Sequence, residues 1–244
     1  MKTKRVLEID FLRGIAILMM VVYHFSWNLM YFRIYTADLY SGFWGIFQKL
    51  TAGLFIFIVG VSLVLSYFST IKKTPKKYPS KFLLRGLRVF CYGLIITAFS
   101  LLFMPDAFVF FGILHFIGIS IILTTPFIRF RYLNLGLGIA ALAIGIYLKK
   151  FMFSFPWLVW LGLKYPVRTL DLFPILPWIG VVFLGLFIGN LIYPKGKRIF
   201  KTRPNKIIEK ISQPVRFLGK HALLMYFVHL PVVYGVAYLL YIFA

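Results

Sequence analysis

The stretch FLRGIAILMMVVYHFSWNLMY, residues 11–31, decides the class of fold. A transmembrane helix needs about 20 mainly apolar residues, and this stretch supplies them around a few polar side chains, chiefly those of Arg13, His24 and Asn28. The chain of 244 residues is 61% hydrophobic and 14% charged, whereas a soluble domain is about 45–50% apolar and about 25% charged. This composition excludes a soluble enzyme, a disordered chain and a secreted disulfide scaffold, and it predicts a polytopic membrane protein.

Seven segments in all have the length and apolar character of a membrane-spanning helix. They cover approximately residues 9–32, 46–69, 83–104, 109–128, 132–149, 173–193 and 217–243. Residues 150–172 are ambiguous, because their apolar centre is too short to cross a bilayer, while Trp157 and Trp160 suit a segment at the interface. The predicted fold is an all-α, polytopic integral membrane bundle of about seven transmembrane helices, with residues 1–244 forming a single domain.

The distribution of basic residues predicts the orientation of the helices. The chain has 28 Lys and Arg against 6 Asp and Glu, giving a net charge of +22. If the N-terminus lies in the cytoplasm, 20 basic residues fall on the cytoplasmic side and 6 on the opposite side, while Arg13 and Lys220 lie near span ends. This asymmetry agrees with the positive-inside rule. We therefore expect the N-terminus in and the C-terminus out. Because the basic clusters alternate with apolar spans, no nucleic-acid partner is expected.

Ionisable side chains inside the first predicted span carry most of the functional information. Such groups are costly in hydrocarbon and usually face the bundle interior or a water-filled cavity. At about 100° per residue, the eleven positions from Arg13 to His24 turn a helix three times plus roughly 20°, so both side chains lie on one face, about 16 Å apart along the axis. Arg13 then either extends to the membrane surface or pairs with Asp10. His24 lies too deep for that, and is either a site residue or a hydrogen-bonded core residue.

Three more ionisable residues join His24 as candidates. His115 lies a few residues below the predicted outer surface in the fourth span, His229 near mid-depth in the seventh, and Asp171 at the outer rim before the sixth. By depth, His24, His115 and His229 are expected to converge in the outer half of the bundle. His221 lies near the cytoplasmic edge and is not expected to join them. A structural hydrogen-bonding role is the alternative for His115 and His229, and a solvated helix cap is the alternative for Asp171.

Four stretches in chain order carry a family resemblance. They are DFLRGIAI at 10–17, GILHFIGIS at 112–120, DLFPILPW at 171–178 and LGKHALLMYFVHLP at 218–231. The spacing of Arg13 and His24 is similar to the Arg-x10-His pattern of the transmembrane acyltransferases. More closely, the chain resembles the bacterial and archaeal relatives of the heparan-α-glucosaminide N-acetyltransferase catalytic domain, although about seven spans are fewer than the larger members of the superfamily have.

This resemblance implies transfer of an acyl group from a cytoplasmic acyl-CoA to an amine or hydroxyl of a sugar or glycolipid. The acyl group that it favours is acetyl, with acetyl-CoA as the donor. It also implies a prokaryotic cytoplasmic membrane, with acyl-CoA, the acceptor and membrane lipids as partners and with a homodimer left open. His24 matches the catalytic histidine and Arg13 its companion in the pattern. The other family-like positions are those of His115, Asp171, His221 and His229. No metal is implied, and the lone Cys91 excludes a thiolate metal cluster.

The residue types suit this chemistry. A thioester is already activated, so the enzyme must mainly deprotonate the acceptor and hold both reactants. His24, neutral in apolar surroundings, can act as a general base or carry the acetyl group as a nucleophile. Arg13 can bind a donor phosphate or the developing oxyanion. Basic residues near the cytoplasmic mouth are further candidates for the coenzyme A phosphates, although the positive-inside bias also explains them; these are Lys76, Lys77, Arg85 and Arg88.

Three other functions fit parts of the same pattern. A transporter or flippase of a small molecule or lipid-linked sugar would use the polar stripe as a substrate path. A membrane b-type cytochrome would use histidine pairs as haem ligands, but His221 lies at the wrong depth for such a pair. A purely structural membrane subunit would need none of these side chains for activity. The acyltransferase is the predicted function.

Overall fold

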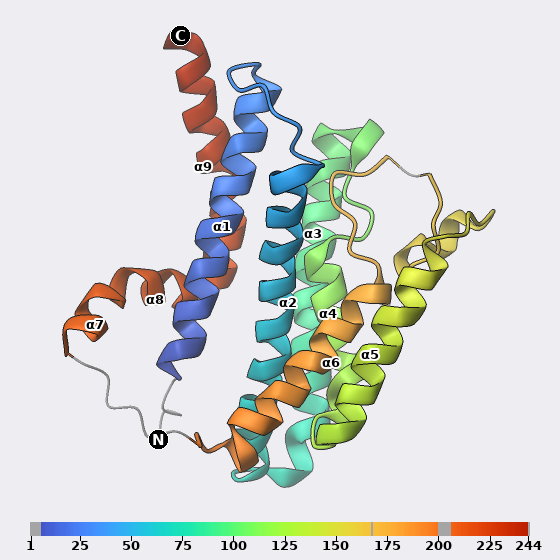
Figure 1. The fold of residues 1–244 in the computed structure, drawn as a ribbon, viewed down its shortest axis with the longest axis vertical. Coiled ribbons are helices and arrows are strands. Elements are labelled where there is room, and N and C mark those ends of the chain that lie inside the picture. The colour runs from blue at the N-terminus through green and yellow to red at the C-terminus, as the bar shows by residue number, and fades with distance from the viewer. Residues whose placement is uncertain (1–5, 167, 200–205, 244) are drawn as a thin grey trace. The chain divides into compact units, whose positions relative to one another are not determined.

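Helices form the regular structure of residues 6–166, 168–199 and 206–243, the part of the chain that the computed structural model describes (Figure 1). The α-helices are α1 (Leu7–Tyr31), α2 (Gly42–Ile71), α3 (Tyr78–Phe103), α4 (Ile113–Thr124), α5 (Arg131–Leu148), α6 (Ile175–Ile192), α7 (Lys206–Ile211), α8 (Gln213–Lys220) and α9 (Ala222–Phe243). Short 3₁₀ helices lie between several of them, at Pro75–Lys77, Pro105–Ala107, Thr125–Phe127, Pro156–Leu161 and Pro194–Gly196. The predicted all-α class is confirmed.

Among the helices so described, six are long and apolar enough to cross a membrane, as a polytopic bundle requires. They are α1, α2, α3 with the 3₁₀ turn before it, α5, α6 and α9. The span predicted at 109–128 is shorter in the structure, because α4 and the 3₁₀ turn after it run only from Ile113 to Phe127. Residues 108–112 are not helical, and the chain from 107 to 111 is hydrogen-bonded to residues 169–173.

The last span also differs from its prediction at 217–243. Helix α9 begins at Ala222, and residues 213–220 form the separate helix α8. The two helices meet at His221, whose backbone (φ −108°, ψ 28°) is not helical. Gly219 and Lys220 make this stretch a poor start for an apolar span, because one is a weak helix former and the other is charged. Residues 150–172, left ambiguous by the sequence, hold one 3₁₀ helix where they are described and add no span.

Two compact units divide the chain. Unit 1 comprises residues 1–58 and 202–244, and unit 2 comprises residues 59–201. In unit 1, α1 packs against both α8 and α9. A Cβ on Gly14 would overlap the carbonyl of Val215, and a Cβ on Gly219 would overlap the carbonyl of Asp10. Glycine is therefore needed at both positions for α8 to lie with its backbone against α1.

Unit 2 is built from two helix pairs, α3 with α4 and α5 with α6, together with the second part of α2. Small residues again set the spacing. A Cβ on Gly118 of α4 would lie 2.7 Å from the Phe90 nitrogen of α3, and one on Gly180 of α6 would lie 2.7 Å from the Gly138 carbonyl oxygen of α5. Glycines at these contacts let the helix backbones approach as closely as membrane helices commonly do.

The predicted orientation rests partly on residues that the structure does not describe. Lys2, Lys4, Arg5, Lys201 and Arg203 count toward the cytoplasmic side and lie outside the described residues. The orientation therefore stays a prediction.

Candidate active site

Two of the candidate histidines meet in unit 1, where α1 supplies His24 and α9 supplies His229. Their ring centroids lie 5.0 Å apart, with the ring planes inclined at 58°. His229 is buried, with 6% of its surface exposed. The two helices pack against each other, as Figure 1 shows. The prediction that His24 and His229 converge agrees with this contact.

The hydrogen bonds of His229 determine where its ring can react. Its Nδ1 lies 2.7 Å from the carbonyl oxygen of Tyr226. A carbonyl oxygen can only accept a hydrogen bond, so Nδ1 carries the hydrogen and donates it. In the neutral ring the lone pair then lies on Nε2, and this atom is buried with no hydrogen-bond partner among the residues that the structure describes. A buried acceptor without a partner is costly, so it is a strong candidate for a group that meets a substrate.

The surroundings of the pair hold it in place. The Tyr23 ring meets the His24 ring edge-on at 5.7 Å, and the Tyr23 hydroxyl donates to the Leu39 carbonyl at 3.3 Å. Asn28, which the sequence places on the same polar stripe, donates from Nδ2 to the His24 carbonyl oxygen at 2.8 Å. Asn28 is thereby bonded within α1, and the His24 ring contacts the rings of Tyr23 and His229.

Arg13 lies on α1 below this pair, about three turns away along the helix. Its Nη1 is 3.2 Å from Oδ1 of Asp10, the ion pair that the sequence offered as one alternative. Asp10 is buried, with 8% of its surface exposed, and lies where α8 crosses α1 at Gly219.

His115 lies in unit 2 and has a different environment. The Gly112 backbone N–H donates to its Nδ1 at 3.2 Å, so this nitrogen is the acceptor. Its Nε2 lies 3.4 Å from Oγ1 of Thr97, which itself donates to the Val109 carbonyl at 2.7 Å. The Thr97 oxygen is therefore the acceptor for Nε2–H. Both ring nitrogens have partners, as expected of a histidine with a structural role. Its predicted convergence with His24 and His229 stays a prediction.

Asp171 caps the start of α4. Its Oδ2 accepts a hydrogen bond from the Ile113 backbone N–H at 3.1 Å. Burial raises the pKa of this carboxyl to about 7, and the hydrogen bonds from the backbone N–H groups of Ile113 and Leu172 act in the opposite direction. Asp171 is thus a helix cap, which was the alternative role considered for it, but its carboxyl is desolvated rather than solvated. The helix it caps begins 58 residues earlier in the chain.

Backbone hydrogen bonds hold this cap in position. The Leu170 N–H donates to the Ala107 carbonyl at 3.0 Å, and the Phe173 N–H donates to the Phe111 carbonyl at 2.8 Å. Sequence reasoning missed these bonds and also missed Thr97 as the partner of His115. A signal for Thr97 existed, because a hydroxyl side chain inside an apolar span needs a partner.

The four basic candidates for the donor phosphates belong to unit 2. Lys76 and Lys77 lie in the 3₁₀ turn before α3, and Arg85 and Arg88 lie three residues apart on α3. All four are exposed. Within the described residues, no three His, Cys, Asp or Glu side chains are grouped as a metal ion would require.

Comparison with known proteins identifies the family. A family model described as heparan-alpha-glucosaminide N-acetyltransferase, catalytic, matches residues 5–231, nearly the whole chain. No curated protein matches the chain. No solved structure matches it either. The family match includes all four quoted motifs and the His24–His229 pair, and it shows that the chain, a membrane protein by its helices, belongs to the heparan-α-glucosaminide N-acetyltransferase catalytic-domain family.

Proposed function

We propose that this protein transfers an acetyl group from acetyl-CoA to an amine or hydroxyl of a sugar or glycolipid, at the His24–His229 pair. Membership of the family gives acyl transfer in general. The observation that supports the site is the buried Nε2 of His229, which has no hydrogen-bond partner in the described part of the chain and belongs to a ring 5.0 Å from that of His24. Its lone pair is in position to take a proton beside a second imidazole.

In the direct route, one imidazole of the pair acts as general base. It takes the proton of the acceptor amine or hydroxyl while the acceptor atom bonds to the acetyl carbonyl carbon. The C–S bond of the thioester then breaks, and the coenzyme A thiolate leaves with the proton returned by the imidazolium. General base catalysis of this kind contributes typically about 10²–10⁴-fold.

In the two-step route, His24 is the nucleophile. A nitrogen of its ring bonds to the acetyl carbon, the C–S bond breaks, and coenzyme A leaves as the thiol with the hydrogen of the other ring nitrogen. The acceptor then attacks the acetyl-imidazole, Nε2 of His229 takes the acceptor proton, and the proton passes to the His24 ring as its bond to the acetyl carbon breaks. The two routes can be told apart in the absence of acceptor. Only the two-step route forms an acetyl-enzyme, which can react back with labelled coenzyme A to give labelled acetyl-CoA. Exchange measured with wild type and with His229→Asn distinguishes them.

Arg13 is the proposed donor-binding residue. Its ion pair with Asp10 orients the guanidinium, which suits a bidentate hold on a coenzyme A phosphate. The exposed Lys76, Lys77, Arg85 and Arg88 are proposed to add to this attraction. Arg13→Ala should weaken coenzyme A binding by about tenfold, measured by calorimetry. The matched control is Arg168→Ala, which removes the same charge on the predicted outer side; equal affinity in wild type and Arg13→Ala would remove the role.

The orientation and membrane belong to the same proposal, with the protein in a prokaryotic cytoplasmic membrane, its N-terminus in and its C-terminus out. The asymmetry of basic residues supports it. Cysteines introduced at Lys76 and Lys164 in a Cys91→Ala background test it with an impermeant maleimide. Labelling of intact cells at position 76 rather than 164 would contradict it.

Turnover is the decisive test of the function. Purified protein in lipid nanodiscs is given radiolabelled acetyl-CoA with amino sugars and glycolipids as acceptors. The expected result is release of free thiol together with an acetylated acceptor identified by mass spectrometry. In proteoliposomes, movement of the acceptor without thiol release would instead establish a transporter or flippase.

A further inference from the structure

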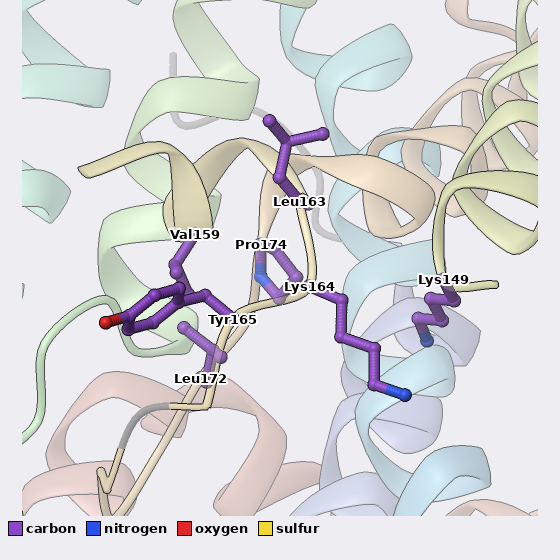
Figure 2. Close-up of a pocket in the computed structure, with 8 residues that line it drawn as sticks. Lys149, Val159, Leu163, Lys164, Tyr165, Leu172 and Pro174 are labelled. Atoms are coloured by element: carbon purple, nitrogen blue, oxygen red, sulfur yellow. The ribbon is translucent and has the colours of Figure 1, made fainter. Parts of the chain in front are cut away.

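A cavity of about 300 Å³ lies in unit 2, and none of its lining residues is assigned above to catalysis or donor binding (Figure 2). Lys149 lines it just after the end of α5, Val159 comes from the 3₁₀ helix Pro156–Leu161, and Leu172 and Pro174 come from the chain just before α6. Residues 162–165 complete the wall. The volume is near the lower end of the roughly 300–1,000 Å³ typical of small-molecule pockets.

The lining of this cavity combines positive charge with apolar surface. Lys149 and Lys164 are the two charged lining residues, and none of the eight is acidic. In Figure 2 the Lys164 side chain extends toward the side where Lys149 lies, away from the group formed by Val159, Tyr165 and Leu172. A ligand that matches this arrangement carries an anionic group at one end and apolar surface at the other.

The walls are held by the backbone. The Phe153 N–H donates to the Lys164 carbonyl at 3.0 Å, which fixes the strand-like segment that carries Lys164. Gly162 has a φ of 124°, and a Cβ there would lie 2.6 Å from the Leu176 carbonyl oxygen. Only glycine fits this turn. The cavity is therefore formed by the fold before any ligand arrives.

The neighbouring segment indicates where the ligand comes from. Phe151, Met152, Phe155 and Trp157 are large apolar residues that lie exposed in the segment between α5 and the turn at Gly162. Exposed aromatic residues at the end of a membrane span are typical of the lipid–water interface. Lysines at this depth attract anionic headgroups, each by roughly fivefold in affinity. A lipid at this interface has both the negative charge and the apolar surface that the cavity requires.

We infer that the cavity binds the headgroup of an anionic phospholipid, with its phosphodiester held between Lys149 and Lys164 and its glycerol backbone against Val159 and Leu172. The cavity is too small for acyl chains, which stay in the bilayer beside Trp157. Binding here is independent of acyl transfer at the His24–His229 pair and needs neither acetyl-CoA nor acceptor.

The test counts bound lipid. Protein is purified in mild detergent with equal amounts of phosphatidylglycerol and phosphatidylcholine, and retained lipids are measured by native mass spectrometry. Wild type should retain phosphatidylglycerol preferentially, and Lys149→Gln with Lys164→Gln should lower this preference roughly 25-fold, the product of two fivefold effects. Lys150→Gln removes the same charge from a neighbour that does not line the cavity, and should retain the lipid like wild type.

Further variants keep the result interpretable. Lys149→Arg with Lys164→Arg keeps the charges and should keep the preference, and His24→Ala should retain phosphatidylglycerol while losing acyl transfer. Equal retention in wild type and the double glutamine variant would overturn the inference. So would a rise in the Tm of delipidated protein with inorganic phosphate as large as that with phosphatidylglycerol, because the site would then take a free anion.

Discussion

Two buried histidines, one in each unit, differ in how their hydrogen bonds are completed. His229 is 6% exposed and His115 is 2% exposed, so burial does not separate them. The Nδ1 atom of His229 faces a carbonyl oxygen, whereas that of His115 faces a backbone N–H. These partners impose opposite tautomers on the two rings.

The tautomers decide what remains available for chemistry. In His115 the hydrogen lies on Nε2 and is directed at Thr97, so the ring has no unused nitrogen. In His229 the lone pair lies on Nε2, which has no hydrogen-bond partner within residues 6–166, 168–199 and 206–243. In these two histidines, the backbone partner of Nδ1 therefore determines which ring nitrogen is available for chemistry, whereas burial does not distinguish them. The first three of the four predictions below test this difference, and the fourth tests the buried cap of α4.

His24→Ala should have the largest effect. It removes the imidazole that matches the family's catalytic histidine, and kcat should fall by at least about 100-fold, the usual contribution of a general base. Thiol release from acetyl-CoA in nanodiscs measures it, with Tm and elution volume showing that the fold is intact. A kcat within about threefold of wild type would remove His24 from the reaction.

The same substitution at both sites gives the sharpest comparison. Asparagine keeps a polar atom near the position of Nδ1 and has nothing at Nε2. His229→Asn should therefore keep its bond to the Tyr226 carbonyl, leave Tm within about 2 °C of wild type and lower kcat by about 10- to 100-fold. His115→Asn should keep the bond from Gly112 and leave kcat within about threefold. Equal losses of kcat in the two variants would refute the distinction.

His115→Leu should act on stability. It leaves the buried Gly112 N–H without an acceptor, which costs about 1–3 kcal/mol and should lower Tm by roughly 2–12 °C in a chain of this size. His115→Asn should recover most of this loss. Thermal unfolding followed by tryptophan fluorescence measures both variants. A large loss of kcat in His115→Leu at a temperature well below its Tm would show that His115 has a role in the reaction.

Asp171 should make stability depend on pH. Its folded-state pKa of about 7 lies above the ordinary value of 3.8, so the folded protein binds the extra proton between these values. Its contribution is complete below about pH 4 and is lost as the pH rises through about 7. Tm should fall by roughly 2–6 °C between pH 6 and pH 8.5.

Asp171→Asn is the control for this dependence. Its amide oxygen can still accept from the Ile113 N–H, but the side chain does not titrate. The variant should therefore lose most of the fall in Tm over that range, while other titrating groups continue to act. An unchanged slope in Asp171→Asn would show that another group is responsible.

Sequence periodicity predicted the class of fold and part of the candidate site. The length of the apolar stretches identified the spans. Arg13 and His24 lie on one helix, so the repeat of 3.6 residues per turn is enough to predict that they share a face. Contact between His24 and His229 joins the two ends of the chain, and depth alone could suggest it without fixing the 5.0 Å separation.

Other features could not be derived from local pattern. Asp171 caps a helix that begins 58 residues before it, and a cap is normally sought in the helix that follows. The separate helix α8 depends on the backbone contact of Gly14 and Gly219 with their partners across two helices. The cavity at Lys149 and Lys164 is formed by turns whose geometry no hydropathy pattern encodes.

Helix α1 runs without a break from Leu7 to Tyr31, so the separation between any two of its residues along the axis is fixed. If Arg13 holds the phosphate end of the donor and His24 receives its thioester, the distance between the two tasks is fixed at about 16 Å by eleven helical steps. A donor with a shorter distance between its phosphate and its thioester cannot reach Arg13 and His24 at the same time. A single residue inserted between them would swing His24 by about 100° away from His229, so the spacing can change only in whole multiples of the helical repeat.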